Sequence, residues 1–157
     1  MEDPIPQVPD SHRDLLERPL IAHLATERAD GGLQSNPMWF AWDGGRIRLT
    51  HTRTRQKFRN LQAEPRVALS IVDTADSQRY LEIRGVVEAI EDDKGGPFYR
   101  RLRQRYGVNP DAPMPDADER VVVVIRPTTV LARSPANAEG PPAIERVSVD
   151  GRRVFRP

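Results

Sequence analysis

Residues 50–61 read Thr-His-Thr-Arg-Thr-Arg-Gln-Lys-Phe-Arg-Asn-Leu, and they crowd hydroxyls and cations between a predicted strand and a predicted helix. A helix N-terminus carries roughly half a positive unit charge and prefers acidic side chains in its first turn. Arg55 and Lys57 take those places instead. A bound anion relieves this conflict. Phosphate suits the position because helix amides, threonine hydroxyls, a guanidinium and an ammonium can surround its oxygens.

Lysine is rare in this chain, which makes its place in the segment informative. Of the 24 basic residues, only Lys57 and Lys94 are lysines. Charge patterning alone also allows a solvated basic helix face without a ligand. His51 could act as a general acid, although a lone histidine beside arginines is more often a hydrogen-bond donor. The segment therefore predicts a phosphate site and assigns no catalytic residue.

A second segment, residues 34–40, reads Gln-Ser-Asn-Pro-Met-Trp-Phe. Pro37 cannot donate a ladder hydrogen bond, so this predicted strand belongs at a sheet edge. If the edge faces a planar ring, Ser35 and Asn36 could bond the heteroatoms of the ring while Met38 packs on it. An ordinary edge strand, with Trp39 and Trp42 in the core, is an equally supported interpretation.

The alternation of apolar and polar residues predicts several strands and few helices. Strands are expected at residues 20–26, 33–42, 46–50, 67–72, 80–90 and 120–132, and helices from residue 11, at 56–63 and at 94–106. Tight Gly-rich turns at 31–32 and 43–45 favour antiparallel pairing. Gly85 interrupts one strand, as at a bulge or a barrel corner. The pattern predicts a mainly β (α+β) fold, a small antiparallel barrel with short flanking helices.

The length of 157 residues, with 38% hydrophobic and 30% charged residues, predicts one folded domain. Residues 1–10 form an extended N-terminal arm, 11–133 the folded domain and 134–157 a C-terminal extension that includes a mobile linker (134–143) and a short terminal hairpin. Ser11 and Asp14 resemble a capping box at the first helix.

Composition excludes several classes of function. A net charge of +1 provides no global attraction to nucleic acid or to an anionic membrane. There is no cysteine, and three scattered histidines make no metal site. No secretory signal or membrane-length apolar run is present, so a cytoplasmic protein is expected.

The order of motifs resembles a known family. The chain runs through Ser35-Asn36-Pro37, Thr50-His51-Thr52, Arg55-x-Lys57-x-Arg59-Asn60-Leu61 and Glu64-Pro65-Arg66-Val67. This order is similar to the pyridoxamine-phosphate-oxidase-like split-barrel superfamily, and within it to the F420-dependent oxidoreductase branch. The resemblance covers about residues 15–133. It implies an antiparallel split β-barrel of the FMN-binding type, which forms a homodimer with a cofactor groove at the subunit interface.

The resemblance also implies roles for individual residues. Arg55 and Lys57, with Gln56 between them, hold the cofactor phosphate, and Tyr80 is a weaker candidate from the partner subunit. The residues along the ribityl or phosphate region are Thr50, His51 and Thr52, and those along the ring are Ser35, Asn36, Pro37 and Met38. An arginine-rich rim of Arg53, Arg59 and the arginines at 100–105 could attract the acidic polyglutamate tail of F420.

The implied function is an F420-dependent oxidoreductase that transfers hydride to an unidentified unsaturated small molecule. The chain ends in Gly-Arg-Arg-Val-Phe-Arg-Pro and lacks the arginine- and tryptophan-bearing ending of true pyridoxamine phosphate oxidases, which argues against a vitamin B6 substrate. Two alternatives stay open at this point: an FMN-dependent oxidase or reductase of the same fold, and a non-catalytic protein that stores or carries the cofactor.

Overall fold

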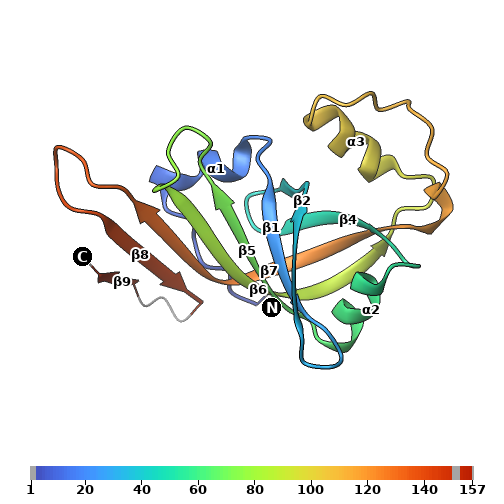
Figure 1. Cartoon of the computed structure of the whole chain (residues 1–157), viewed down its shortest axis with the longest axis horizontal. Coiled ribbons are helices and arrows are strands. Elements are labelled where there is room, and N and C mark those ends of the chain that lie inside the picture. Colours follow the sequence, from blue (N-terminus) through green and yellow to red (C-terminus); the bar gives the residue numbers. More distant parts are fainter. Residues whose placement is uncertain (1–2, 150–152, 157) are drawn as a thin grey trace.

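The computed structural model describes residues 3–149 and 153–156 of the chain, which form a strongly curved antiparallel sheet with short helices around it (Figure 1). The strands are β1 (Ala22–Glu27), β2 (Leu33–Met38), β3 (Ala41–Trp42), β4 (Ile47–Thr52), β5 (Arg66–Val72), β6 (Tyr80–Asp92), β7 (Arg120–Ser134), β8 (Ala143–Ser148) and β9 (Arg153–Arg156). The helices are α1 (Asp14–Glu17), α2 (Gln56–Ala63) and α3 (Pro97–Arg105), with 3-10 turns at Asp10–His12 and Ala117–Glu119.

The barrel strands pair in the order β2-β1-β5-β6-β7-β4-β3, and every pairing is antiparallel. No ladder joins β2 to β3 among the described residues, so the sheet curls without closing. β8 pairs with the far end of β7, and β9 pairs with β8. Figure 1 shows this hairpin projecting from one side of the barrel, while α3 covers the other end. The predicted fold class, a split antiparallel barrel, is confirmed.

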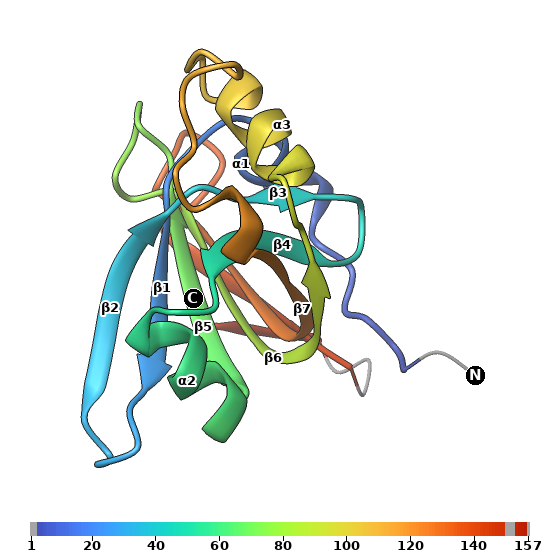
Figure 2. The same cartoon turned by 90° about the vertical axis from the view of Figure 1, so that its right-hand side faces the viewer.

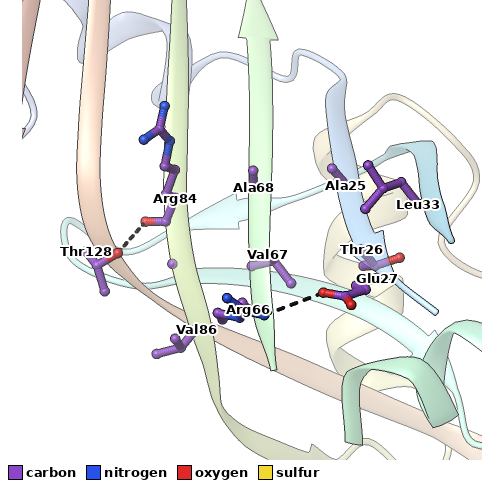
Figure 3. Close-up of a pocket in the computed structure, with 11 residues that line it drawn as sticks. Ala25, Thr26, Glu27, Leu33, Arg66, Val67, Ala68, Arg84, Val86 and Thr128 are labelled. Carbon is purple, nitrogen blue, oxygen red and sulfur yellow. Dashed lines mark hydrogen bonds and ion pairs between the residues drawn. The ribbon is translucent and has the colours of Figure 1, made fainter. Parts of the chain in front are cut away.

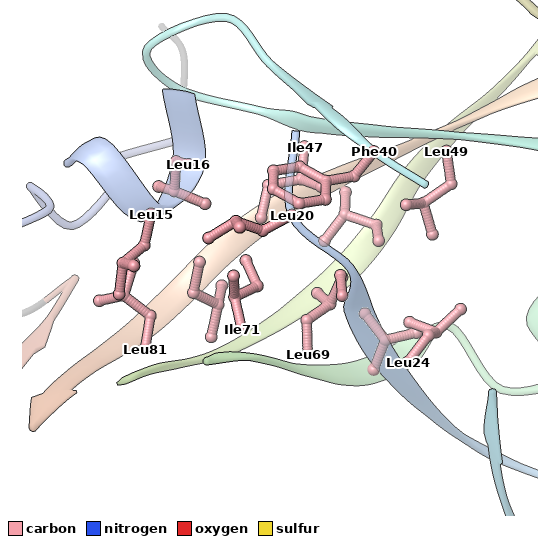
Figure 4. Close-up of a cluster of buried hydrophobic side chains, with 14 of the residues drawn as sticks. Leu15, Leu16, Leu20, Leu24, Phe40, Ile47, Leu49, Leu69, Ile71 and Leu81 are labelled. Carbon is pink, nitrogen blue, oxygen red and sulfur yellow. The ribbon is translucent and has the colours of Figure 1, made fainter. Parts of the chain in front are cut away.

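Alternation along the strands places one apolar set inside the curl of the sheet. The inward residues of β1, β4, β5 and β6 and the α1 leucines meet around Phe40, which is fully buried (Figure 4). A smaller cluster lies under α3, where Phe98 and Leu102 pack on Val122 and Val124 of β7. Val123 and Ile125 of β7 belong to the first cluster and Val122 and Val124 to the second, so β7 separates two cores.

Several local predictions are corrected. The strand expected at 33–42 breaks after Met38, leaving β3 as a separate short strand. The capping box does not form, because the Ser11 hydroxyl bonds His12 and the Asp14 carboxylate pairs with Arg79. Residues 134–143 are the loop of the β7–β8 hairpin, closed by an isolated bridge between Asn137 and Gly140, and not a linker between separate units. The predicted terminal hairpin is present, and its turn lies outside the described residues.

The bulge expected at Gly85 is present, since the register between β6 and β7 shifts there. A Cβ atom at this position would lie 2.6 Å from the Arg126 carbonyl oxygen and 3.0 Å from Ile125 Cγ2. The residue must be glycine because the two strands approach too closely for a side chain.

We expect Gly85→Ala to lower the free energy of unfolding by about 2 kcal/mol, because backbone atoms of β7 must move to admit the methyl group. Denaturant unfolding measures the change. Gly140→Ala is the matched control, since open space surrounds that position. Equal stabilities for the two variants would contradict this account of the bulge.

Candidate functional site

The candidate site begins at the short connection between the end of β4 and the start of α2. Arg55 precedes the helix with an extended backbone, and no side chain caps the first turn. No acidic residue lies in that turn. The positive end of the helix dipole therefore faces further positive charges, as the sequence predicted.

Lys57 is the least expected side chain of the site. Lys57, Asn60 and Leu61 share the buried face of α2, so the lysine is only 9% exposed. Its Nζ lies 3.3 Å from Met38 Sδ of β2 and makes no ion pair among the described residues. Burial lowers the pKa of Lys57, and the charge of Arg55 lowers it further. A buried ammonium with a thioether as its neighbour is costly unless an anion joins it.

The two arginines just before α2 differ in whether they form an ion pair. Arg53 forms an ion pair with Asp92 at 3.2 Å. The Arg55 side chain is exposed, and within residues 3–149 and 153–156 it contacts no carboxylate. Arg55 and Lys57 are thus both available to the same anion.

His51 is buried between these cations, at 6% exposure. Its Nδ1 accepts a hydrogen bond from the Thr52 backbone N–H at 2.8 Å, which leaves the ring proton on Nε2. Burial lowers its pKa from 6.5 to about 4, and the charges of Lys57 and Arg55 act in the same direction. At neutral pH the imidazole is therefore uncharged and can donate one hydrogen bond, which fits a binding group better than a charged acid.

A cavity of about 280 Å³ opens beside this cluster, and four of the predicted residues line it. Its lining is Pro37, Met38, Trp39, Thr50, Arg55, Tyr99 and Arg120. The lining residues come from β2 and the residue after it, the end of β4, the residue before α2, α3 and the start of β7. Figure 2 shows how these elements are arranged. An apolar, aromatic side thus faces a cationic end, which suits a planar ring that carries a phosphate.

Trp39, Tyr99 and Arg120 were missed by the sequence analysis. Trp39 stacks on Tyr106 with ring centroids 4.8 Å apart, and the Tyr106 hydroxyl donates to the Leu20 carbonyl at 2.6 Å. The guanidinium of Arg120 lies over the Tyr99 ring, with its carbon Cζ 3.8 Å from the ring centroid. The only signal in the sequence was the pair of tyrosines on the basic helix, because residues 39, 99 and 120 meet only through the fold.

The other predicted residues lie at different depths. Ser35 and Asn36 are further along β2 and do not line the cavity; the Asn36 side-chain oxygen accepts from Gln34. Thr52 is buried, and its hydroxyl has no partner among the described residues. Gln56 is the first residue of α2. Tyr80 is the first residue of β6 and pairs with Arg133, at the end of β7 that is far from the cavity residue Arg120. This chain alone therefore does not bring Tyr80 to the cavity.

Comparison with known proteins assigns the chain to a family. The sequence model described as pyridoxamine 5'-phosphate oxidase matches residues 8–134. The chain belongs to the pyridoxamine 5'-phosphate oxidase family. No curated protein sequence matches it.

Solved structures agree with this membership of the pyridoxamine 5'-phosphate oxidase family. A protein named F420 reductase is 51% identical, with a TM-score of 0.76 over 78% of this chain and 98% of that one. A putative pyridoxamine 5'-phosphate oxidase from Listeria innocua is 20% identical, with a TM-score of 0.63 over 78% and 95% of the two chains. A conserved hypothetical protein from Mycobacterium tuberculosis is 24% identical, with a TM-score of 0.60 over 83% and 86%. The latter two share the fold alone.

A second cavity, of about 430 Å³, lies over β1, β5 and β6 of this oxidase-family barrel (Figure 3). It is larger than the first cavity but mostly apolar, and both of its arginines are in ion pairs: Arg66 with Glu27 and Glu64, and Arg84 with Glu82. None of the predicted cofactor residues lines it. Arg55, which contacts no carboxylate among the described residues, lines the smaller cavity instead.

The rim hypothesis fails for two arginines of α3. The buried Arg103 donates to the carbonyl oxygens of Ala112 and Pro113. Arg105 donates to the carbonyls of residues 16–18 at the end of α1. These side chains fasten α3 and its following loop to the barrel and are not a solvated face.

No helix among the described residues has the length and apolar composition that crossing a membrane requires.

We expect the free energy of unfolding to fall by about 2 kcal/mol as the pH drops from 6.5 to about 4.5, because unfolded His51 takes up a proton there and folded His51 does not. Above about pH 7.5 both the folded and the unfolded state are neutral at this residue, so His51 adds no slope there. Denaturant unfolding at a series of pH values measures the effect.

His51→Asn is the control, because the amide oxygen can accept the same Thr52 N–H but does not titrate. Its stability should change much less over that range. The carboxylates whose pKa values are lowered, such as Asp14 and Asp73, lose their contribution only below about pH 4. Identical slopes for the wild type and the variant would show that His51 is not the titrating group.

Proposed function

We propose that this chain is an F420-dependent oxidoreductase, in which the phosphate of the deazaflavin is held at the start of α2 and the ring lies in the cavity beside β2. When bound, F420 supplies hydride transfer to an unsaturated small molecule. The 51% identity to a protein named F420 reductase supports the choice of cofactor.

One observation carries the proposal: within the part of the chain that the structure describes, the buried ammonium of Lys57 and the nearby guanidinium of Arg55 have no carboxylate partner. Structural ion pairs explain other cations of the region, such as Arg53 with Asp92. Burying the ammonium of Lys57 without compensation destabilises a fold, and the nearby positive charge of Arg55 adds to the cost. A phosphoryl group between them offsets that cost, since it can take a bidentate contact from the arginine and a point contact from the lysine.

The remaining residues of the site fit a phosphate-bearing planar molecule. Thr50 offers a hydroxyl to the cavity. His51 lies on the other face of β4, close to Lys57 and Arg55, and its neutral ring carries an Nε2–H donor. Pro37 and Met38 provide an apolar edge for a ring. No side chain stands out as a proton donor, so the protein acts mainly by positioning the two reactants.

The assembly belongs to the same proposal: a cytoplasmic homodimer in which Tyr80 reaches the cofactor groove of the partner. The exposed Leu33, at 83%, and the apolar cavity next to it are a surface of the kind that protein interfaces bury. Sedimentation velocity should give the mass of two chains.

FMN is the rival cofactor, because the family match is to pyridoxamine 5'-phosphate oxidase. Both molecules carry a phosphate and a planar ring, so the cation pair serves either. Fluorescence titrations with F420 and FMN separate them, and turnover with reduced cofactor separates an enzyme from a protein that only stores it.

We expect Lys57→Met to weaken F420 binding at least tenfold, a change of about 1.4 kcal/mol in binding free energy. The same variant should raise the free energy of unfolding of the free protein by about 1 kcal/mol, because an unpaired buried charge is removed. Fluorescence titration and denaturant unfolding measure the two effects.

Lys94→Met is the matched control, since it removes the only other lysine from an exposed turn outside the cavity. It should change neither affinity nor stability appreciably. Unchanged affinity in Lys57→Met, or a loss of stability together with affinity, would contradict the assigned role of Lys57.

A further inference from the structure

Arg120 lines the same cavity as Arg55, and all three nitrogens of its guanidinium donate hydrogen bonds. Nε and Nη2 donate to the two carboxylate oxygens of Asp116 at 3.1 and 2.9 Å. The third nitrogen, Nη1, donates to Thr50 Oγ1 at 3.3 Å. The flat face of the group lies 3.8 Å from the centroid of the Tyr99 ring. Its side chain is only 11% exposed.

This arrangement makes Arg120 different from the other cations of the site. Its charge is compensated by Asp116 in a bidentate pair, whereas Arg55 and Lys57 contact no carboxylate among the described residues. A compensated guanidinium is a weak anchor for an anion. The guanidinium is, however, a strong geometric constraint. Because it is planar and Asp116 holds two of its nitrogens, the direction of the third nitrogen, Nη1, is fixed.

The constraint acts on Thr50. A threonine hydroxyl has one proton and two acceptor lone pairs. Because Nη1 of Arg120 can only donate, it takes a lone pair of Oγ1 and leaves the proton free. Thr50 lines the cavity and is only partly buried, and no other hydrogen bond of its hydroxyl is found among the described residues.

Tyr99 and the loop before β7 hold the arginine in place. The Tyr99 ring also lies 4.6 Å from the guanidinium carbon of Arg103, so it packs against two cations. Arg103 fastens the loop at Ala112 and Pro113, shortly before Asp116. The geometry of Thr50 therefore depends on a chain of contacts that begins on α3.

We propose that Arg120 is a positioning residue, which turns the Thr50 hydroxyl into a hydrogen-bond donor aimed into the cavity at an acceptor oxygen of the bound molecule. The acceptor is an oxygen of the phosphate-bearing side chain of that molecule. This rests on the proposed function for the identity of the ligand, and on the contacts of Arg120 alone for the orientation of Thr50.

Affinity for F420, measured by fluorescence titration in a double-mutant cycle, tests the coupling. Thr50→Val should weaken binding about tenfold, and Thr50→Ser should retain most of it. Arg120→Lys, which keeps the charge but cannot reach Asp116 and Thr50 together, should cost at least fivefold in the wild-type background and nothing beyond Thr50→Val in that background. Arg126→Lys, a matched change on β7 at the Glu88 ion pair, should leave affinity unchanged. Additive losses from Thr50→Val and Arg120→Lys would overturn the proposal.

A measurement on the free protein separates this inference from the proposed function. Three-bond couplings to the Thr50 methyl carbon report the side-chain rotamer without any ligand. They should indicate one rotamer in the wild type and in Arg126→Lys, and rotamer averaging in Arg120→Lys. A single Thr50 rotamer in Arg120→Lys overturns the positioning role even if F420 binds. Failure of the wild type to bind either F420 or FMN overturns the proposed function while the couplings still decide the role of Arg120.

Discussion

The site depends on the buried positive charge of Lys57, which has no negatively charged partner among residues 3–149 and 153–156. Lys57 faces inward because it shares a helix face with Leu61. Its ammonium contacts the thioether of Met38, at a position where a carboxylate would stabilise the folded protein more. The neighbouring histidine is neutral, so it adds no further charge at neutral pH. The free protein is thereby less stable than it could be, and a ligand phosphate is the group that restores the balance.

The barrel supplies the rigidity that such a site needs. β4 presents Thr50 to the cavity on one face and buries His51 on the other, because successive residues of a strand alternate. β7 pairs with β4 at this end and carries Arg120, while α3 brings Tyr99 over it. The cavity is therefore built from β2, β4, α3 and β7, which are far apart in sequence, and each contributes one or two side chains.

The sequence was sufficient for the local part of this arrangement and insufficient for the rest. Helix α2 was predicted at its observed bounds, because Phe58 and Leu61 recur at helical spacing and Glu64-Pro65 ends the element. The cation cluster lies within one continuous segment, so its neighbours were visible along the chain. Tyr99 and Arg120 could not be predicted, since their contact requires the β4–β7 register and the packing of α3. The arginines of α3 were misassigned for the same reason: their carbonyl partners lie on α1 and in the loop after α3.

The most direct test compares each cofactor with its counterpart that lacks the phosphate. If Lys57 and Arg55 hold a phosphoryl group, the protein should bind FMN at least tenfold more tightly than riboflavin, and F420 more tightly than its phosphate-free deazaflavin core by a similar factor. The preference should disappear in Lys57→Met. Equal affinity of the wild-type protein for the phosphorylated and phosphate-free forms would contradict the account.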